Sequence, residues 1–243
     1  MKISIITISY NSSSTIEETL KAVQKQTYPH IQHIIVDGKS TDNTLEICND
    51  FNHISKIVSE PDKGVYDAFN KGLNMATGEV VGFLNADDVF CDEHTLKKIS
   101  EAFDEQTDCV FANLNYINNK GKIVRKWRSN PYQKGAFKKG WMPAHPTFYC
   151  RKAIYDHLGG YDDSFYIAGD FELMLRFLEK NNIRSKFIDQ TLIKMSTGGL
   201  SNSGLVSKIK IIKEEIRALK QNKINYSLPK YFFHKALKIK EFF

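Results

Sequence analysis

Residues 79–88 read EVVGFLNADD, an apolar run that ends in two adjacent carboxylates, Asp87 and Asp88. Such a run is typical of a buried parallel strand. Ligands of open α/β sheets bind just beyond the carboxyl ends of the strands, so acids at this point are placed for chemistry. Their oxygens suit Mg²⁺ or Mn²⁺, the hard cations that usually hold a substrate diphosphate. Taken alone, such a pair is more often a strand end that caps the next helix, but two further strand ends of this chain carry polar residues in the same way.

Two further apolar runs end in polar turns in the same way. Residues 2–8 are followed by a turn rich in polar side chains, and residues 33–36 are followed by Asp37. Helical patterns with start signals come after both turns. Strands that alternate with helices imply right-handed crossovers and a parallel sheet. We therefore expect Thr7–Tyr10, Asp37 and the Asp87–Asp88 pair to lie on one edge of the sheet.

The composition indicates a chain with a substantial core and no internal division. Its 243 residues are 42% hydrophobic, and no linker of low complexity or internal repeat is visible. We expect one α/β domain, residues 1–204, and a helical tail, residues 205–243. Four widely spaced cysteines without a C-x-x-C pair argue against a zinc site and favour a reducing compartment. Neither a signal-peptide core nor a transmembrane run is present, so we expect a cytoplasmic protein.

The basic residues gather in the tail. Residues 205–243 contain ten Lys and Arg against three Glu, a net charge of +7, whereas the whole chain carries +6. Aliphatic and aromatic residues alternate with these lysines, as in an interfacial helix that rests on an anionic leaflet, where each basic residue contributes about 1 kcal/mol. A helix packed on its own domain, or on a second subunit in a homodimer, is the equal alternative. We expect no nucleic-acid partner.

Six motifs occur in order along the chain. They are residues 5–11 (IITISYN), 26–28 (QTY), 36–42 (VDGKSTD), 74–79 (NMATGE), 83–88 (FLNADD) and 169–176 (GDFELMLR). In this order and spacing they resemble the signature of family 2 glycosyltransferases with the GT-A fold. The resemblance implies a GT-A-like (Rossmann-like), mostly parallel sheet sandwiched by helices, and an enzyme that transfers a hexose from a nucleotide sugar.

The resemblance also assigns residues to the nucleotide-sugar donor. It implies a nucleoside pocket in which Tyr10 stacks on the base and Asp37 accepts the imide N–H of uracil. Asp87 and Asp88 would hold the ribose and a Mn²⁺ or Mg²⁺ ion, which neutralises charge on the departing diphosphate. Asn85 stands where the family has its first acid, and it offers a carbonyl oxygen without a charge. The donor residues are Thr7, Ser9, Tyr10, Asp37, Asp62, Lys71, Asn85, Ala86 and Asp87, and the metal ligands are Asp88 and Asp87.

On the acceptor side, Asp170 matches the general base of the family. It precedes an apolar helical pattern, whose first turn would present its carboxylate to the acceptor hydroxyl. Deprotonation of that hydroxyl gives a single displacement with inversion, and general-base assistance contributes about 10²- to 10⁴-fold. The alternative for Asp170 is a helix cap. Trp141, His145 and Glu172 are the further acceptor-side candidates: Trp141 suits stacking on a sugar ring, and His145 suits contact with a phosphate or metal.

These features predict an inverting hexosyltransferase of bacterial surface-polysaccharide biosynthesis (O-antigen, capsule or exopolysaccharide). Its donor would be a UDP-sugar, and its acceptor a lipid-linked oligosaccharide at the inner face of the membrane. Two other functions stay open. A nucleotidyltransferase or sugar-nucleotide pyrophosphorylase also uses paired acids on an α/β sheet, although no glycine-rich basic loop lies near the amino terminus. A non-catalytic nucleotide- or glycan-binding module would keep Asp37 and the fold without needing Asp170.

Overall fold

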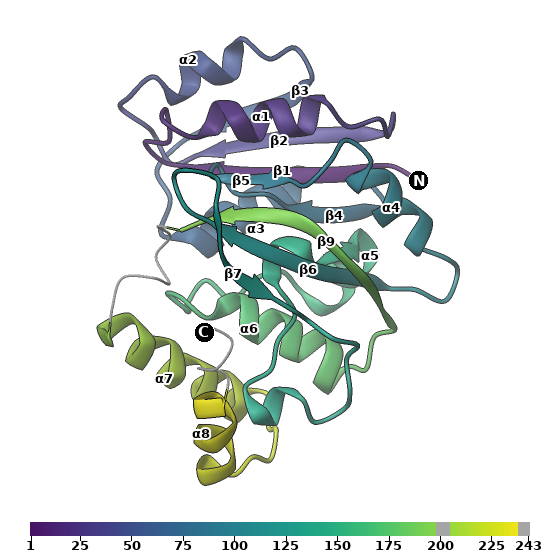
Figure 1. The fold of residues 1–243 in the computed structure, drawn as a ribbon, viewed down its shortest axis with the longest axis vertical. Coiled ribbons are helices and arrows are strands. Elements are labelled where there is room, and N and C mark those ends of the chain that lie inside the picture. Colours follow the sequence, from purple (N-terminus) through teal and green to yellow (C-terminus); the bar gives the residue numbers. More distant parts are fainter. Residues whose placement is uncertain (198–204, 238–243) are drawn as a thin grey trace.

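A mixed sheet of nine strands forms the centre of the computed structural model (Figure 1). The structure describes residues 1–197 and 205–237. Within them the sheet has the order β3-β2-β1-β4-β8-β6-β9-β5, and β7 pairs with β6. The strands are β1 (Ile3–Ser9), β2 (Ile31–Asp37), β3 (Ile54–Ser59), β4 (Val80–Phe83), β5 (Asp88–Phe90), β6 (Cys109–Ile117), β7 (Ile123–Trp127), β8 (Tyr149–Arg151) and β9 (Ser185–Ser196).

Helices cover both faces of this sheet and one of its ends. In Figure 1, α1 and α2 lie near the β3 end, whereas α7 and α8 lie at the opposite, lower end beneath α6. The helices are α1 (Ile16–Gln24), α2 (Thr44–Asn49), α3 (Val65–Met75), α4 (Thr95–Ala102), α5 (Lys152–Leu158), α6 (Gly169–Met174), α7 (Leu205–Gln221) and α8 (Leu228–Leu237). Two 3₁₀ turns, η1 (Phe137–Lys139) and η2 (His145–Thr147), and a π-helical continuation of α6, η3 (Leu175–Lys180), complete the fold.

The four strands β3, β2, β1 and β4 are parallel, as their apolar runs predict. Residues of β1 point alternately into two hydrophobic cores: Ile6 packs on the α3 side, whereas Ile3 and Ile5 pack on the side of α1 and α4. Burial on both faces explains why the strand is rich in isoleucine, with Ser4 and Thr7 as its internal polar residues. The register pairs Ser9 with Asp37 and Asp37 with Ser59, so the carboxyl ends of three strands meet at one edge.

The other half of the sheet is mixed. β8 pairs antiparallel with both β4 and β6, β9 runs parallel to β6, and β5 closes the sheet antiparallel to β9. Asp88 is the first residue of β5, and the next helix, α4, begins only at Thr95. The acids after β4 therefore lie in a tight turn between two strands and do not cap a helix.

Helices α7 and α8 pack onto the α/β domain. Ala218, Leu219 and Tyr231 are 0% exposed and belong to the same hydrophobic core as α3 and α6. Tyr231 also donates its hydroxyl hydrogen to the buried carboxylate of Glu215. The expected domain boundary after residue 204 lies at the end of the segment 198–204, outside the described residues. None of the helices in the described ranges is both long and apolar enough to cross a membrane.

Candidate active site

The turn between β4 and β5 gathers the oxygen atoms of a candidate metal site. Asp88 is fully buried, and Asp87 and Asn85 are partly exposed. The Asn85 Nδ2 atom donates to Asp88 Oδ2 over 3.3 Å, and Thr19 of α1 fixes the turn by donating to the Asp88 carbonyl over 2.8 Å. The Oδ1 atoms of Asn85 and Asp88 are buried without a hydrogen-bond partner in the described part of the chain. Such unpaired acceptors are rare in folded proteins and mark places where an ion or water belongs.

Electrostatics in this turn also favour a cation. Burial raises the pKa of Asp88 well above its usual range, and the nearby Asp87 charge raises it further. Burial likewise raises the pKa of Asp87. A divalent cation reverses both shifts because it stabilises the ionised forms. Within the described residues, no group of three or more His, Cys, Asp or Glu side chains has the arrangement of a metal site, so further ligands would come from Asn85, substrate phosphates and water.

Asp170 lies in the first turn of α6. Ala168 occupies the N-cap position of that helix, so Asp170 is not its cap. One oxygen of its carboxylate accepts the N–H of Phe171 over 2.8 Å and the hydroxyl of Tyr66 over 3.5 Å. Burial raises the pKa of Asp170 to about 6, and these two hydrogen bonds oppose the rise. A helix N-terminus favours the ionised form, but here desolvation outweighs it.

A chain of aromatic residues supports the Asp170 carboxylate. A Cβ at Gly169 would lie 2.8 Å from the Tyr66 ring, so a glycine is needed for this close approach. The Tyr66 ring stacks on Tyr161 at 5.6 Å, and the Tyr161 hydroxyl is 2.8 Å from His145 Nε2. Burial lowers the pKa of His145 to about 4, so this imidazole is neutral at physiological pH. His145 therefore lies behind Tyr161 and supports it.

Tyr116 connects the candidate metal turn with Asp170. The register places Met195 of β9 opposite both Asp88 and Tyr116, so these three residues form a row across β5, β9 and β6. Burial raises the pKa of Tyr116, and the charges of Asp88 and Asp170 both add to the rise. Tyr116 therefore lies within electrostatic range of both carboxylates, whereas the nearby Arg125 charge lowers its pKa.

Asp37 is the centre of a closed hydrogen-bond cluster. It is 0% exposed and accepts from Ser9 Oγ at 3.1 Å, from Ser40 N at 2.8 Å and from Ser59 Oγ at 2.7 Å, with the Ser40 hydroxyl as a fourth donor. A carboxylate has about four lone-pair sites, so its acceptor capacity is filled. Uracil recognition by Asp37, which stays a prediction, would require one of these bonds to break.

The predicted donor residues around Asp37 have different environments. Thr7 is fully buried and hydrogen-bonds to His33 Nε2 over 3.0 Å, whereas Tyr10 is 66% exposed and free to meet a ligand. Ala86 is buried at 5% exposure in the turn of the acids. These positions leave Tyr10 as the side chain of this group that can stack on a base.

Gly38 lies directly against Tyr10 and Asp62. A Cβ at Gly38 would lie 2.9 Å from Asp62 Oδ2 and 3.3 Å from Tyr10 Cδ2, so both side chains border this position. Asp62 Oδ1 is bound to Lys71 Nζ at 2.7 Å, and Lys71 also meets Asp67 at 3.2 Å. The Lys71 ammonium is therefore neutralised by Asp67 of its own helix and by Asp62 of the preceding loop, and it orients Asp62.

The first comparison with known proteins concerns the family. The sequence model of the family described as "Glycosyl transferase family 2" matches residues 4–168. The chain belongs to this family. That range includes the turns after β1, β2 and β4, and it ends just before the Asp170 helix.

Individual relatives of this chain are glycosyltransferases as well. A PGL/p-HBAD biosynthesis glycosyltransferase of Mycobacterium bovis is 27% identical over 212 residues, which cover 82% of this chain and 79% of that protein. An uncharacterized glycosyltransferase of Nostoc sp. is 36% identical over 122 residues, which cover 49% of this chain and 37% of that protein.

Solved structures show the same fold. The S. aureus TarS 1–349 complex with UDP-GlcNAc has a TM-score of 0.72 and 23% identity, with 94% of this chain and 68% of that chain covered. The mannosyltransferase PcManGT from Pyrobaculum calidifontis, in complex with GDP-Man and Mn²⁺, has a TM-score of 0.63 and 18% identity, with 98% and 80% covered. The predicted family and GT-A fold are confirmed.

Two acceptor-side candidates of the glycosyltransferase serve its architecture. The Trp141 indole N–H donates to the Ser129 carbonyl over 2.6 Å, and its ring packs among aromatic neighbours. Glu172 is 2% exposed and binds Arg176 and Asn222, each over 3.0 Å. Their contacts support positioning, and a direct contact with the acceptor stays a prediction for both.

Sequence reasoning missed Tyr66 and Lys235 as site residues. Tyr66 shares its helical spacing with Phe69, which indicates a core position, and the structure shows that it is both core and partner of Asp170. Lys235 belongs to a tail rich in lysines, yet its charge lowers the pKa of Asp170 against the effect of burial. Nothing in the sequence distinguishes Lys235 from the other lysines of the tail.

Proposed function

We propose that this glycosyltransferase moves a hexose from a UDP-linked donor to a hydroxyl of a lipid-linked surface glycan, with inversion. One observation carries this proposal: Asp88, in the turn with the unpaired oxygens, lies in one row with Tyr116 across the sheet, and the partly buried Asp170 lies within electrostatic range of the same phenol. This arrangement supports a site for the leaving diphosphate close to a base for the incoming hydroxyl, as a single displacement needs.

The donor-side acids fit a Mn²⁺ or Mg²⁺ ion. Asp87, which is partly exposed, would meet the ion directly, and the unpaired Oδ1 atoms of Asp88 and Asn85 would support it from below. When bound, such an ion neutralises negative charge on a diphosphate and stabilises it as a leaving group. Mn²⁺ in the PcManGT complex is consistent with this proposal.

The acceptor step is assigned to Asp170. With a pKa of about 6, its carboxylate is ionised at pH 7 by roughly ten to one and still basic enough to take a hydroxyl proton. The Tyr66 hydroxyl and the Phe171 N–H direct one oxygen, Oδ1, into the protein. This arrangement leaves Oδ2 as the oxygen for the acceptor proton.

The assignment of UDP rests on the better structural match. TarS, with the higher TM-score, is solved with UDP-GlcNAc and with UDP, whereas PcManGT is solved with GDP-Man. In this chain we assign the nucleobase to the space around Tyr10 and Asp62, next to Gly38. Tyr10 offers a ring for stacking, and the Oδ2 atom of Asp62 faces the same space as an acceptor for the uracil imide.

For the acceptor, we propose a lipid-linked oligosaccharide of O-antigen, capsule or exopolysaccharide type at the inner face of the membrane. The tail helices expose Val206 at 79%, Ile209 at 48%, Phe232 at 47% and Phe233 at 63%, and lysines lie among them. Exposed aromatic and aliphatic residues with basic neighbours suit an anionic leaflet, which attracts the charge and accepts the apolar groups.

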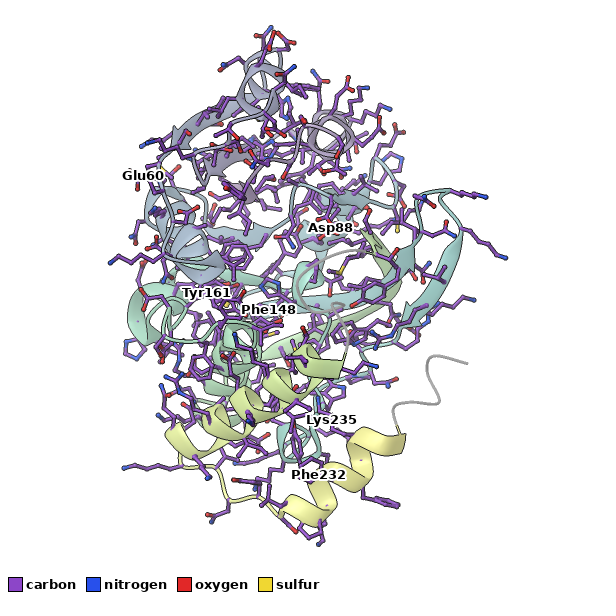
Figure 2. All side chains as sticks on the ribbon, turned by 90° about the vertical axis from the view of Figure 1, so that its left-hand side faces the viewer. Glu60, Asp88, Phe148, Tyr161, Phe232 and Lys235 are labelled. Atoms are coloured by element: carbon purple, nitrogen blue, oxygen red, sulfur yellow. The ribbon has the colours of Figure 1, made fainter. Side chains whose placement is uncertain are left out.

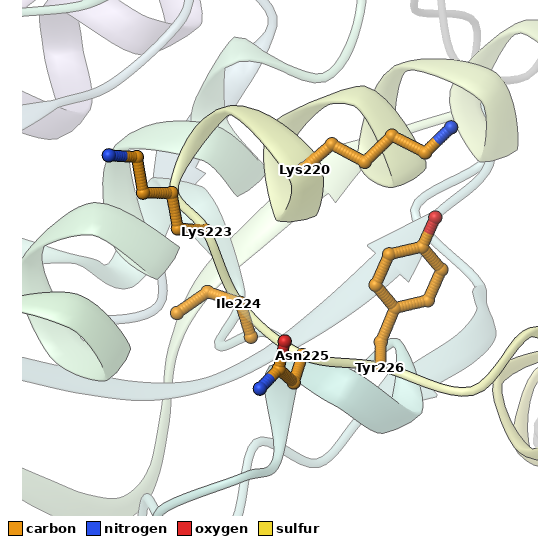
Figure 3. Close-up of a pocket in the computed structure, with 5 residues that line it drawn as sticks. All are labelled: Lys220, Lys223, Ile224, Asn225 and Tyr226. Carbon is orange, nitrogen blue, oxygen red and sulfur yellow. The ribbon is translucent and has the colours of Figure 1, made fainter.

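A shallow cavity of about 320 Å³ lies at the turn between α7 and α8. Figure 3 shows that the ammonium groups of Lys220 and Lys223, which line it, point in opposite directions. They do not converge on one anion. The basic charge of the tail is therefore spread over a surface, which fits an extended leaflet better than a single phosphate.

The proposed function is tested with a panel of UDP- and GDP-sugars in the presence of Mn²⁺. A bound donor at about a hundred times its Kd stabilises a protein by about 2.7 kcal/mol, which a thermal shift detects. We expect one UDP-hexose to give the largest shift and to release UDP slowly in water. Release of pyrophosphate would instead indicate a nucleotidyltransferase, and binding without any product would indicate a binding module.

A further inference from the structure

Helix α7 holds the chain segment that leads into the Asp170 helix. The Glu214 carboxylate accepts three consecutive backbone N–H groups, those of Tyr166 at 3.0 Å, Ile167 at 2.8 Å and Ala168 at 2.9 Å. Ala168 is the N-cap of α6, and Asp170 follows two residues later. A single side chain from the tail therefore fixes the backbone immediately before the base.

Three more side chains of the same helical region secure this segment and α6. Arg217 donates to the Ser164 carbonyl over 3.1 Å, with its guanidinium 4.2 Å from the centre of the Phe165 ring. Gln221 Nε2 donates to Asp162 Oδ2 over 2.8 Å. Asn222 reaches α6 itself through Glu172.

Among these contacts, that of Glu214 is the strongest by its chemistry. A carboxylate that accepts several N–H groups forms charge-assisted hydrogen bonds, which are roughly twice as strong as neutral ones. Its negative charge also lies at the positive end of α6 and η3, a continuous stretch from Gly169 to Lys180. Residues 162–168 belong to no strand or helix, so these N–H groups have no ladder partner.

We propose that Glu214 is a positioning residue for sugar transfer, which holds Asp170 in its partly buried position through the backbone of residues 166–168. The proposal rests on the proposed role of Asp170 as general base. It makes α7 a part of the acceptor-side machinery, in addition to any contact of the tail with a membrane.

Several groups face Asp170 and would sense a change in its position. They are Tyr66 from α3, Tyr116 from β6, Tyr161 from the segment before α6, and Lys235 from α8. Figure 2 shows Lys235 between α7 and α8, where its ammonium group binds Glu215 over 2.7 Å. Burial is the main cause of the raised pKa of Asp170. A looser segment would admit water and lower that pKa toward its ordinary value.

The test compares Glu214→Ala and Glu214→Gln with Glu101→Ala, which removes an exposed glutamate from α4, and with Asp170→Asn. We expect Glu214→Ala to lower kcat about tenfold or more, with the donor KM within about twofold of wild type, because only orientation in the transition state is lost. The acid limb of the kcat profile should move below pH 6. Glu214→Gln, which keeps one acceptor oxygen, should lie between Glu214→Ala and wild type.

Two results would overturn the inference: a kcat for Glu214→Ala equal to that of Glu101→Ala, or a reduced kcat with the acid limb unmoved. Should Glu214→Ala fail to fold, Glu214→Gln decides in the same way, and wild-type kcat and pH profile in that variant would reject the role. Full activity of Asp170→Asn would instead show that the assignment of the base itself is wrong. The two failures are therefore distinguishable.

Discussion

The Tyr66 hydroxyl lies 3.5 Å from Asp170 Oδ1, and it joins α3 to the first turn of α6. Donation to the ionised carboxylate lowers the pKa of Asp170, whereas burial raises it to about 6. The two effects leave a carboxylate that is mostly ionised at neutral pH and whose pKa is still close to the working pH, as a general base needs. Tyr66 thus sets the lower end of the working pH range.

Replacement of Tyr66 by Phe tests this relationship. The ring and its stacking on Tyr161 remain, but the hydrogen bond to the carboxylate is lost. The pKa of Asp170 should rise, so the acid limb of kcat should move upward from about pH 6 by a fraction of a unit to one unit. A pH profile between 5 and 9 measures it. A limb that stays in place, or moves downward, would contradict the account.

Substitutions at Asp87 and at Asp88 should both weaken metal binding. Asp87 is partly exposed, so Asp87→Asn should weaken Mn²⁺ binding and lower kcat by about 10²-fold or more. Asp88→Asn removes a buried charge while keeping the shape, and we expect loss of metal affinity with little loss of stability, because burial disfavours that charge. Asn85→Asp should keep activity or tighten the metal.

Titration calorimetry with Mn²⁺, with and without UDP, measures these affinities. Full activity in excess EDTA would show that no metal is needed. An active Asp88→Ala enzyme would equally remove Asp88 from the metal site.

Substitutions at Asp37 and Asp62 should have different effects. Asp37 accepts four hydrogen bonds inside the fold, so Asp37→Asn should lower the free energy of unfolding by about 2 kcal/mol. Asp62→Asn should leave stability nearly unchanged and weaken UDP binding. Chemical denaturation and UDP titration separate the two. Unchanged UDP affinity in Asp62→Asn would return uracil recognition to Asp37.

The sequence predicts the parallel half of the sheet because its strands are buried on both faces. The runs in β1, β2 and β4 are predominantly apolar, and each is followed by polar residues at the ligand edge. The mixed half is harder, since β8 has only three residues and β9 reads largely as an exposed strand. The position of β9 depends on its pairing with β6, and the local sequence does not encode this pairing.

Of the candidate site, only the residues that stand in recognisable motifs could be predicted from the sequence. Asp87 and Asp170 stand in recognisable motifs, and both lie at the proposed centre. The saturation of Asp37 could not be foreseen, because serines from three separate segments supply its donors. Glu214 likewise contacts Ala168 across 46 residues of sequence, and a glutamate within a helix rich in charged residues carries no signal of such a contact.

Membrane docking should depend on the aromatic residues of α8. The double substitution Phe232→Ser and Phe233→Ser removes exposed apolar groups and leaves the buried Tyr231 in place. Binding to vesicles with anionic lipid should fall about tenfold or more, and high salt should weaken it further, because exposed charges are screened. The melting temperature should stay nearly constant. Co-sedimentation measures the binding.

A matched control is Ile123→Ser with Val124→Ser, which removes exposed apolar side chains from β7, at 44% and 49% exposure. That variant should bind vesicles as the wild type does. If the Phe232 and Phe233 variant binds vesicles normally but loses a dimer in light scattering, the surface serves assembly and the membrane proposal is wrong.

The turnover of Asp170→Asn tests the central claim most directly. The variant keeps the size of the side chain and removes the base, so kcat at saturating UDP-sugar and acceptor should fall about 10²-fold or more while the donor KM stays within about twofold. Asp163→Asn, an exposed acid in the preceding segment, is the charge-matched control and should retain wild-type turnover. If Asp170→Asn turns over as fast as Asp163→Asn, Asp170 is not the base and the proposed mechanism is wrong.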